Sequence, residues 1–320
     1  GRDPAGRAIL HRLAKDADVV MENMRPGVVE RLGVDYETLR ALNPRIIYST
    51  VTAFGSDGPY KERPGFDPLL QAMGGLMALQ GFGGPPQYLR IAPTDYYCAA
   101  LACQAVLAAL FVRERTGHGQ RVQTSLLQAV LALQSGSVVN YPGREVVLRE
   151  TPTYRLYQGG DGEWFFLAVG NQSFWMKLCK VIGREDLARD PRFGSWLSRR
   201  DHADALMPLL EVAFGSRPAA EWVGILTASD IPAALTRTLQ QFMLDPAVQH
   251  HQMTVTYDHP ELGALTLMGQ PLRFSETQAP DAGPPPTLGQ HTDEVLRQAG
   301  YADHEIADLR PPVVGAGNAS

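Results

Sequence analysis

Three observations predict an α/β fold for this chain of 320 residues. Short apolar runs alternate with helical segments in the first part of the chain, which is typical of a parallel sheet wound with helices. A glycine-rich turn at 159–162 then opens a second unit that mixes strands and helices. The length corresponds to about two domains, and 44% hydrophobic with 20% charged residues is ordinary for a protein with a sizeable core. We therefore expect a doubly wound parallel sheet followed by a smaller α+β unit.

Helix and strand signals alternate closely in the first part. Asp3 is a good helix cap, and Pro4 suits the first helical position. The run 46–51 is rich in β-branched residues, which favours a strand, and Gly117 is a natural helix end. The elements expected, in order, are a helix from Pro4, a strand at 18–21, helices at 26–32 and 36–42, a strand at 46–51, a glycine-rich loop at 54–93, a long helix from Tyr96 to Gly117, a strand at 121–126 and a helix through Leu133.

The second part has weaker signals. The segment 140–157 is predicted to be a linker, and the last ten residues are predicted to be disordered. The elements expected between them are a strand at 164–169, helices near 173–182, 202–213 and 219–228, a β-ribbon around Val255 and 265–268, and two short helices near 293–299 and 303–309.

One stretch, 96–112, has no charged residue, so it could be a membrane span or a core helix. At 17 residues it is short for a membrane span, it is rich in alanine, and it contains Gln104. We therefore predict a buried core helix and no membrane association.

Charge and cysteine usage exclude several classes of function. The net charge is −5 with no long basic run, so a nucleic-acid partner is not expected. Cys98, Cys103 and Cys179 form no zinc or disulfide pattern, which favours reduced thiols in the cytoplasm. The adjacent His250 and His251 are unsuited to holding one metal ion, so no metal site is expected. The sequence contains no G-x-S-x-G, H-E-x-x-H, Walker A or intact G-x-G-x-x-G motif.

Turns at predicted strand ends are the candidate functional positions. The turn 22–27 follows the first strand, and Arg31 lies about one helical turn further on. Ligands of open α/β sheets bind outside the carboxyl ends of strands, and arginines at a helix start suit a phosphate. The alternative is a turn whose arginines are merely solvated. Asp95 has two interpretations as well: a helix N-cap, or an ionised carboxylate that acts as a nucleophile; Asp67 has the same helix-start signature.

These turns, in this order, resemble the class III coenzyme A transferases, which include formyl-CoA and carnitine CoA transferases. The resemblance covers nearly the whole chain. The motifs that carry it are ADVV at 17–20, EN-x-RPG at 22–27, NPRIIY at 43–48, GPY at 58–60, RPGFD at 63–67, QAMGG at 71–75, RE-x-TGHGQ at 113–120 and LGQHT at 288–292.

The resemblance implies a fold, an assembly and a site. The fold is a Rossmann-like large domain, here 1–148, with a small domain at 149–275 and a segment 276–320 that returns to the large domain. Two chains are expected to interlock as a homodimer. Asp95 corresponds to the catalytic aspartate of the family. The residues that fall where the family contacts coenzyme A are Asn23, Met24, Arg25, Arg31, Gly65, Phe66 and Asp67.

The implied reaction moves coenzyme A from an acyl-CoA thioester to a free carboxylic acid. Asp95 attacks the thioester and forms an anhydride, then an aspartyl-CoA thioester, and the acceptor acid takes over the CoA. Tyr96 and Tyr97 are expected to narrow the acyl site for an acid larger than formate. Aromatic residues of the small domain are candidates for the same pocket or for the core: Tyr154, Tyr157, Trp164 and Trp175.

Two alternatives remain at this point. A related branch racemises α-methylacyl-CoA esters and carries a histidine where this chain has Phe66, which cannot transfer a proton. The chain also begins inside the helix that follows the first strand of the family, so a folded but inactive acyl-CoA-binding fragment is the other alternative.

Overall fold

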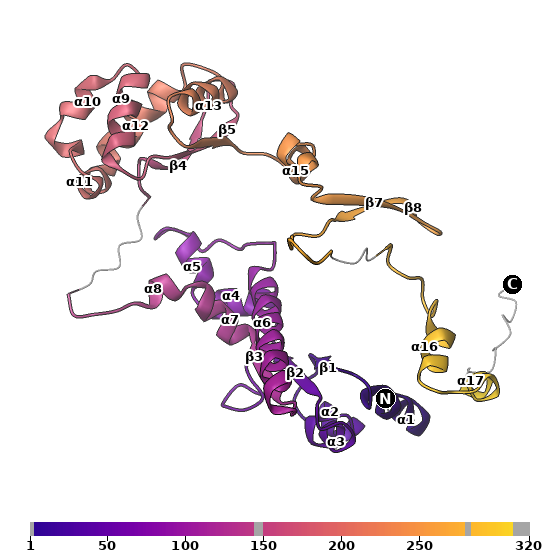
Figure 1. Cartoon of the computed structure of the whole chain (residues 1–320). Helices are drawn as coiled ribbons and strands as arrows, with labels where there is room; N and C mark the ends of the chain where they lie inside the picture. The colour runs from indigo at the N-terminus through magenta and orange to yellow at the C-terminus, as the bar shows by residue number, and fades with distance from the viewer. Residues whose placement is uncertain (1–2, 144–149, 279–282, 310–320) are drawn as a thin grey trace, which may run out of the picture. The chain divides into compact units, whose positions relative to one another are not determined.

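The computed structural model describes residues 3–143, 150–278 and 283–309. The chain divides into two units, one of residues 1–146 and 286–320 and the other of residues 147–285. The first unit contains a parallel sheet in the order β1 (Val19–Glu22), β2 (Ile47–Thr52) and β3 (Arg121–Ser125) (Figure 1). The parallel sheet expected from the alternating pattern is therefore present.

Helices make each crossover between these strands, as parallel pairing requires. The expected helix at 36–42 has the predicted bounds, and Gly33 and Gly117 end helices as predicted. Around and between the strands lie α1 (Pro4–Ala14), α2 (Val28–Leu32), α3 (Tyr36–Leu42), α4 (Asp67–Met73), α5 (Leu76–Gln80), α6 (Pro93–Thr116), α7 (Leu126–Leu133) and α8 (Ser135–Val138).

The central strand β2 carries the core of this unit. Five of its six residues are buried, as expected for a parallel strand covered on both faces. Tyr48 packs with Ala14, Leu39 and Ile46, and its hydroxyl donates to the carbonyl oxygen of Val34 at 3.0 Å. A second cluster joins the helices beyond the strand ends and consists of Phe54, Leu70, Leu76 and Val130.

The long helix α6 differs from the prediction. It packs along β2 and β3 (Figure 1), and it begins at Pro93, three residues earlier than expected. Only 22% of its most apolar stretch is buried, and Leu107 and Phe111 are exposed. The expectation of a buried core helix is therefore wrong within the described residues, because only one stripe of this helix, whose middle is apolar all round, meets the sheet.

Among the described residues, α6 is the one helix long and apolar enough to cross a membrane. A single helix of this kind is weak support for a membrane span, because core helices of soluble proteins share its length and composition. An ion pair anchors its far end, where Arg113 Nη2 lies 2.8 Å from Asp18 Oδ1 at the start of β1.

The second unit has its own core. An antiparallel sheet in the order β4-β5-β6 packs its aromatic side chains against surrounding helices, and Tyr157 and Trp175 are buried while Tyr154 and Trp164 are exposed. Its elements are β4 (Tyr154–Gln158), β5 (Trp164–Ala168), α9 (Gln172–Val181), α10 (Glu185–Arg189), η1 (Pro191–Phe193), α11 (Trp196–Asp201), α12 (Ala203–Phe214), α13 (Ala219–Ala228), β6 (Ala233–Leu235), α14 (Leu239–Met243), α15 (Pro246–His250), β7 (Thr254–His259) and β8 (Gly263–Met268).

Of two predictions for the second unit, one is wrong in part and the other is confirmed. The predicted linker is wrong at its end, because β4 occupies 154–158 and pairs with β5. The predicted β-ribbon is confirmed as the antiparallel pair β7 and β8.

The C-terminal elements α16 (Thr292–Gln298) and α17 (Asp303–Leu309) belong to the first unit. Arg12 of α1 donates to the carbonyl oxygen of Gly300 at 3.2 Å, and its guanidinium lies 3.9 Å from the ring centroid of Tyr301. The disorder predicted for the last ten residues falls outside the described residues.

The turn between α6 and β3 generates a stability prediction. A Cβ atom at Gly119 would lie 2.0 Å from the carbonyl oxygen of Ile46, whereas one at Gly6 in α1 would meet nothing within 4 Å. We expect Gly119→Ala to destabilise the protein by about 1–3 kcal/mol, since backbone must shift to relieve the clash. Gly6→Ala is the control and should stabilise by about 0.5–1 kcal/mol. Urea denaturation checks both, and equal stabilities would contradict this packing.

Candidate active site

A cavity of about 660 Å³ lies at the carboxyl edge of the parallel sheet. The ends of β1 and β2, the loop before α4 and the first turns of α6 form its walls. Open α/β sheets bind ligands at this edge, because every crossover loop begins there. The lining residues are Met21, Glu22, Asn23, Val51, Thr52, Ala53, Gly65, Phe66, Asp95, Cys98, Ala99, Ala102 and Leu126.

The cavity continues into a basic groove. A smaller cavity of about 190 Å³ shares Asn23, Gly65 and Phe66 with the first and adds Arg25, Lys61 and Arg63. A third, of about 310 Å³, shares Arg25 and Lys61 with the second and adds Arg121. The third cavity is also lined by Glu22, Glu30 and Glu62, so its charges balance. The basic cavity is the second one, whose exposed Arg25, Lys61 and Arg63 suit a polyanionic ligand such as a phosphate or pyrophosphate.

The turn after β1 is shaped by its own side chains. Glu22 accepts a hydrogen bond from the backbone N–H of Met24 at 2.9 Å, which fixes the residues that follow. Gly27 has a φ of 80°, in the left-handed region that glycine favours. A Cβ atom at Gly27 would lie 3.3 Å from Nη1 of Arg31, so this arginine folds back over the turn.

The loop before α4 approaches the end of β2 closely. A Cβ atom at Gly65 would lie 2.4 Å from the Cβ of Ala53 and 2.9 Å from the ring of Phe54. Only glycine allows this approach without a shift of the loop. Phe66, the next residue, is 69% exposed and lines the cavity.

Asp95 stands in the first turn of α6, and it is not the cap of that helix. Ala92 is the N-cap residue and supplies no side-chain acceptor, so the interpretation of Asp95 as an N-cap is wrong. Its carboxylate lines the cavity. The backbone N–H groups of Thr94 and Asp95 instead donate to Oδ2 of Asp67, at 2.8 Å and 3.3 Å.

Burial and the neighbouring Asp67 both change the pKa of Asp95. Partial burial raises the pKa of Asp95 above its ordinary value of 3.8, and the negative charge of Asp67 raises this pKa further. The positive end of the α6 dipole acts in the opposite direction and favours the carboxylate. These influences on the Asp95 carboxyl group oppose each other, and carboxyl groups with a perturbed pKa are common at reactive sites.

The structure gathers most of the residues predicted from sequence. Asp95, Asn23, Met24, Arg25, Gly65 and Phe66 line the connected cavities. Arg31 lies beside the turn without lining any of the three, and Asp67 is buried behind the wall. Lys61 and Arg63 were not predicted, although the charged run just before Gly65 was a signal for them.

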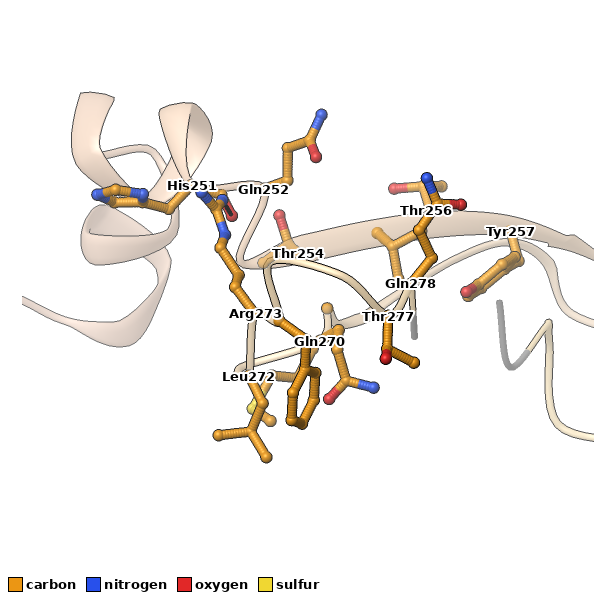
Figure 2. Close-up of a pocket in the computed structure, with 14 residues that line it drawn as sticks. His251, Gln252, Thr254, Thr256, Tyr257, Gln270, Leu272, Arg273, Thr277 and Gln278 are labelled. Carbon is orange, nitrogen blue, oxygen red and sulfur yellow. Dashed lines mark hydrogen bonds between the residues drawn. The ribbon is translucent and has the colours of Figure 1, made fainter. Parts of the chain in front are cut away.

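A further cavity lies in the other unit, next to β7 and β8, with a volume of about 1010 Å³. Figure 2 shows mainly polar side chains around it, with Arg273 directed at the backbone carbonyl of His251, to which it donates at 2.7 Å. Among the described residues its lining holds no carboxylate or thiol. Among the described residues, no group of three or more His, Cys, Asp or Glu side chains is arranged to hold a metal ion.

The first unit is thus an α/β fold whose sheet edge carries a carboxylate at a helix start beside a cluster of cations. The chain matches the family model described as CoA-transferase family III over residues 2–292, and it belongs to this family. Family membership makes the protein a transferase enzyme.

Named relatives agree with this assignment. The succinyl-CoA–D-citramalate CoA-transferase of Chloroflexus aurantiacus is 30% identical, over 97% of this chain and 79% of its own length. The formyl-CoA:oxalate CoA-transferase of Streptomyces avermitilis is 32% identical, over 95% of this chain and 80% of its own.

Solved structures share the fold. The crystal structure of a CAIB/BAIF family protein from Brucella suis matches with a TM-score of 0.82 and 30% identity, over 93% of this chain and 79% of its own. The crystal structure of Rv3272 from M. tuberculosis matches with a TM-score of 0.80 and 32% identity, over 91% of this chain and 78% of its own.

The raised pKa of Asp95 predicts a stabilising substitution. The folded state binds the Asp95 proton more tightly than the unfolded chain, so stability falls as pH rises from 3.8 through the raised pKa. Asp95→Asn should melt at a higher temperature than the wild type at neutral pH, with the gap closing toward the ordinary pKa. Differential scanning calorimetry across pH checks this, with Asp57→Asn as the control for loss of one exposed charge. A variant that melts lower at neutral pH would contradict the assignment.

Proposed function

We propose that this enzyme transfers coenzyme A from an acyl-CoA thioester to a free carboxylic acid, with Asp95 as the nucleophile. The observation that carries the proposal is the position of Asp95, in the first turn of α6, on a cavity continuous with a basic groove. Acyl transfer needs a nucleophile at one end of the ligand and charge recognition at the other.

The first half-reaction forms two covalent intermediates in turn. A carboxylate oxygen of Asp95 attacks the thioester carbonyl carbon, the new C–O bond replaces the C–S bond, and coenzyme A leaves as a thiolate. The thiolate then attacks the aspartyl carbonyl of the mixed anhydride. This releases the donor acid as a carboxylate and leaves an aspartyl-CoA thioester.

The second half-reaction runs these steps toward the acceptor. The acceptor carboxylate attacks the aspartyl-CoA, the CoA thiolate leaves, and a second anhydride forms. The thiolate attacks the acceptor carbonyl of that anhydride, which yields the new acyl-CoA and regenerates the Asp95 carboxylate. No oxidant, metal ion or net proton transfer is needed.

Coenzyme A is proposed to lie along the groove from Asp95 to the cations. Asn23, Met24, Arg25, Gly65 and Phe66 line that path, which supports their predicted role in binding. Lys61 and Arg63 join them as phosphate contacts, because they add two charges to the same cavity. Arg31 stays a proposed contact from the sequence alone.

The proposed acids are small carboxylic acids. The relatives are named for citramalate, oxalate and glutarate, so their acceptors differ while the reaction class is shared. Phe66 lines the cavity, and its ring carries no transferable proton, so no observation favours the racemase alternative.

A homodimer is proposed on the resemblance, and a cytoplasmic location on the cysteine usage. Exposed apolar side chains on one unit support an additional contact surface, among them Leu107 and Phe111 of α6 and Leu131 of α7. The free Cys98, Cys103 and Cys179 are compatible with a reducing compartment.

Trapping with hydroxylamine tests the nucleophile. Wild-type protein incubated with succinyl-CoA or formyl-CoA should give a hydroxamate on Asp95, identified by peptide mass spectrometry. Asp95→Asn should give none and should lose transfer activity by on the order of 10³-fold or more, because the covalent route is gone. Asp57→Asn is the matched control and should behave as wild type. A hydroxamate on another residue would overturn the assignment of Asp95.

The basic groove generates a separate prediction. Lys61→Ala and Arg63→Ala should each raise KM for acyl-CoA by about tenfold, since a charge-assisted hydrogen bond to phosphate is lost. KM for an acyl-pantetheine, which lacks the phosphates, should change little. Arg40→Ala removes an exposed arginine that pairs with Glu37 outside the groove and serves as the control. Equal effects on both thioesters would contradict a phosphate contact.

A further inference from the structure

The start of α6 lacks the usual helix cap. An N-cap side chain normally accepts from the N–H of the second or third helical residue. Here the N-cap is Ala92, and Pro93 follows as the first helical residue, so Thr94 and Asp95 carry the first free N–H groups. Ala92 also has a φ of 50° and a ψ of 53°, a left-handed conformation that costs a non-glycine residue energy.

Asp67 supplies the missing acceptor from a different helix. It is the first residue of α4, and its Oδ2 accepts from both Thr94 and Asp95, which lie 27 and 28 residues further along the chain. Its negative charge also faces the positive end of α6, which is the favourable orientation. The carboxylate of Asp67 therefore caps α6, whose own N-cap residue, Ala92, has no side-chain acceptor.

The other oxygen of Asp67 is held as well. Oδ1 accepts from Nε2 of Gln71, one turn along α4, and both residues are buried, Asp67 at 2% exposure. The side-chain amide of Gln71 bonds both backbone polar groups of Leu89. Its Nε2 donates to the carbonyl oxygen of Leu89 at 2.9 Å, and its Oε1 accepts from the N–H of Leu89 at 3.2 Å. Gln71 thus ties the segment that leads into α6 back to α4.

We propose that Asp67 is a positioning residue for Asp95: its buried carboxylate caps α6 in place of a local side chain and fixes the peptide from which the nucleophile projects. This differs from the sequence interpretation of Asp67 as a coenzyme A contact, because both its oxygens are occupied inside the protein. The proposal rests on the proposed role of Asp95. A displacement of about 1 Å in a reacting group can cost about 100-fold in rate, so loss of the cap has a kinetic signature.

The experiment compares Asp67→Ala with Asp35→Ala. Asp35 caps α3 in the same unit by accepting from the N–H of Thr38 at 3.1 Å, and it lines none of the connected cavities. Three quantities are measured: the melting temperature, the calorimetric affinity for coenzyme A, and the rate of Asp95 hydroxamate formation at saturating succinyl-CoA or formyl-CoA. Both variants should melt lower than the wild type, since each loses one cap.

Only Asp67→Ala should slow hydroxamate formation, by about 100-fold, with coenzyme A affinity unchanged within about twofold. An unchanged rate would make Asp67 a stabilising residue and overturn the proposal. A loss of affinity with the rate intact would make it a ligand contact and overturn the proposal too. If wild type forms no hydroxamate on Asp95, the proposed function fails; if wild type does so and Asp67→Ala is equally fast, only the positioning role fails.

Asp67→Asn keeps an oxygen for the two N–H groups and removes the charge, so it serves if Asp67→Ala does not fold. It should retain more of the rate than Asp67→Ala. The acid limb of the rate should also move to lower pH, because the charge of Asp67 is one of the two causes that raise the pKa of Asp95. Glu22, the other acidic side chain in the cavity lining, is unchanged in this variant. An acid limb that stays in place would overturn the coupling between the two carboxylates.

Discussion

Parallel pairing of β1, β2 and β3 is the constraint on which the site depends. Glu22 pairs with Thr50, and Thr52 pairs with Ser125, so the three strands end within a few residues of one another. Because parallel strands end at one edge, the turn after β1, the loop after β2 and the start of α7 meet there. Residues distant in sequence become the walls of one cavity, and the crossover that contains α6 brings Asp95 to the same edge.

A second constraint is the proximity of two carboxylates at the α4–α6 junction. Asp67 orders the start of α6 through its hydrogen bonds, yet its charge makes ionisation of Asp95 more costly. A protein selected only for stability would avoid this arrangement, whereas a site that needs an ionised carboxylate in a defined position accepts it. The left-handed Ala92 is a further local cost at the same junction. Such costs concentrate at sites of function, because the surrounding structure must compensate for them.

The division of the chain separates chemistry from a second, self-contained core. All the residues proposed to react or to bind coenzyme A belong to the first unit. The second unit is held by its own aromatic cluster, in which Tyr157, Phe165 and Trp222 surround Phe214. Relatives that are 29%, 30% and 32% identical to this chain over the aligned residues are named for different acids. Family membership therefore defines the reaction class but not the acid.

Local signals in the sequence were sufficient for most elements and for the reaction class. The bounds of α3 and α13 match the predicted helices, because caps and apolar spacing act within a few residues. The order of motifs such as those around Asn23 and Gly65 was enough to indicate the family, since each motif is a local turn.

Only the tertiary structure decided which distant residues act together. The sequence shows that Asp67 lies at a helix start. It does not show that Asp67 accepts from the N–H of Thr94, 27 residues away, because that hydrogen bond depends on how α4 and α6 pack. The sequence shows that α6 is apolar, but it does not show that the described unit covers only one stripe of this helix. It shows the charges of Lys61 and Arg63, but not that they share a groove with Asn23. Caps, turns and periodicity are properties of neighbouring residues, whereas a site is a property of chain segments that only folding brings into contact.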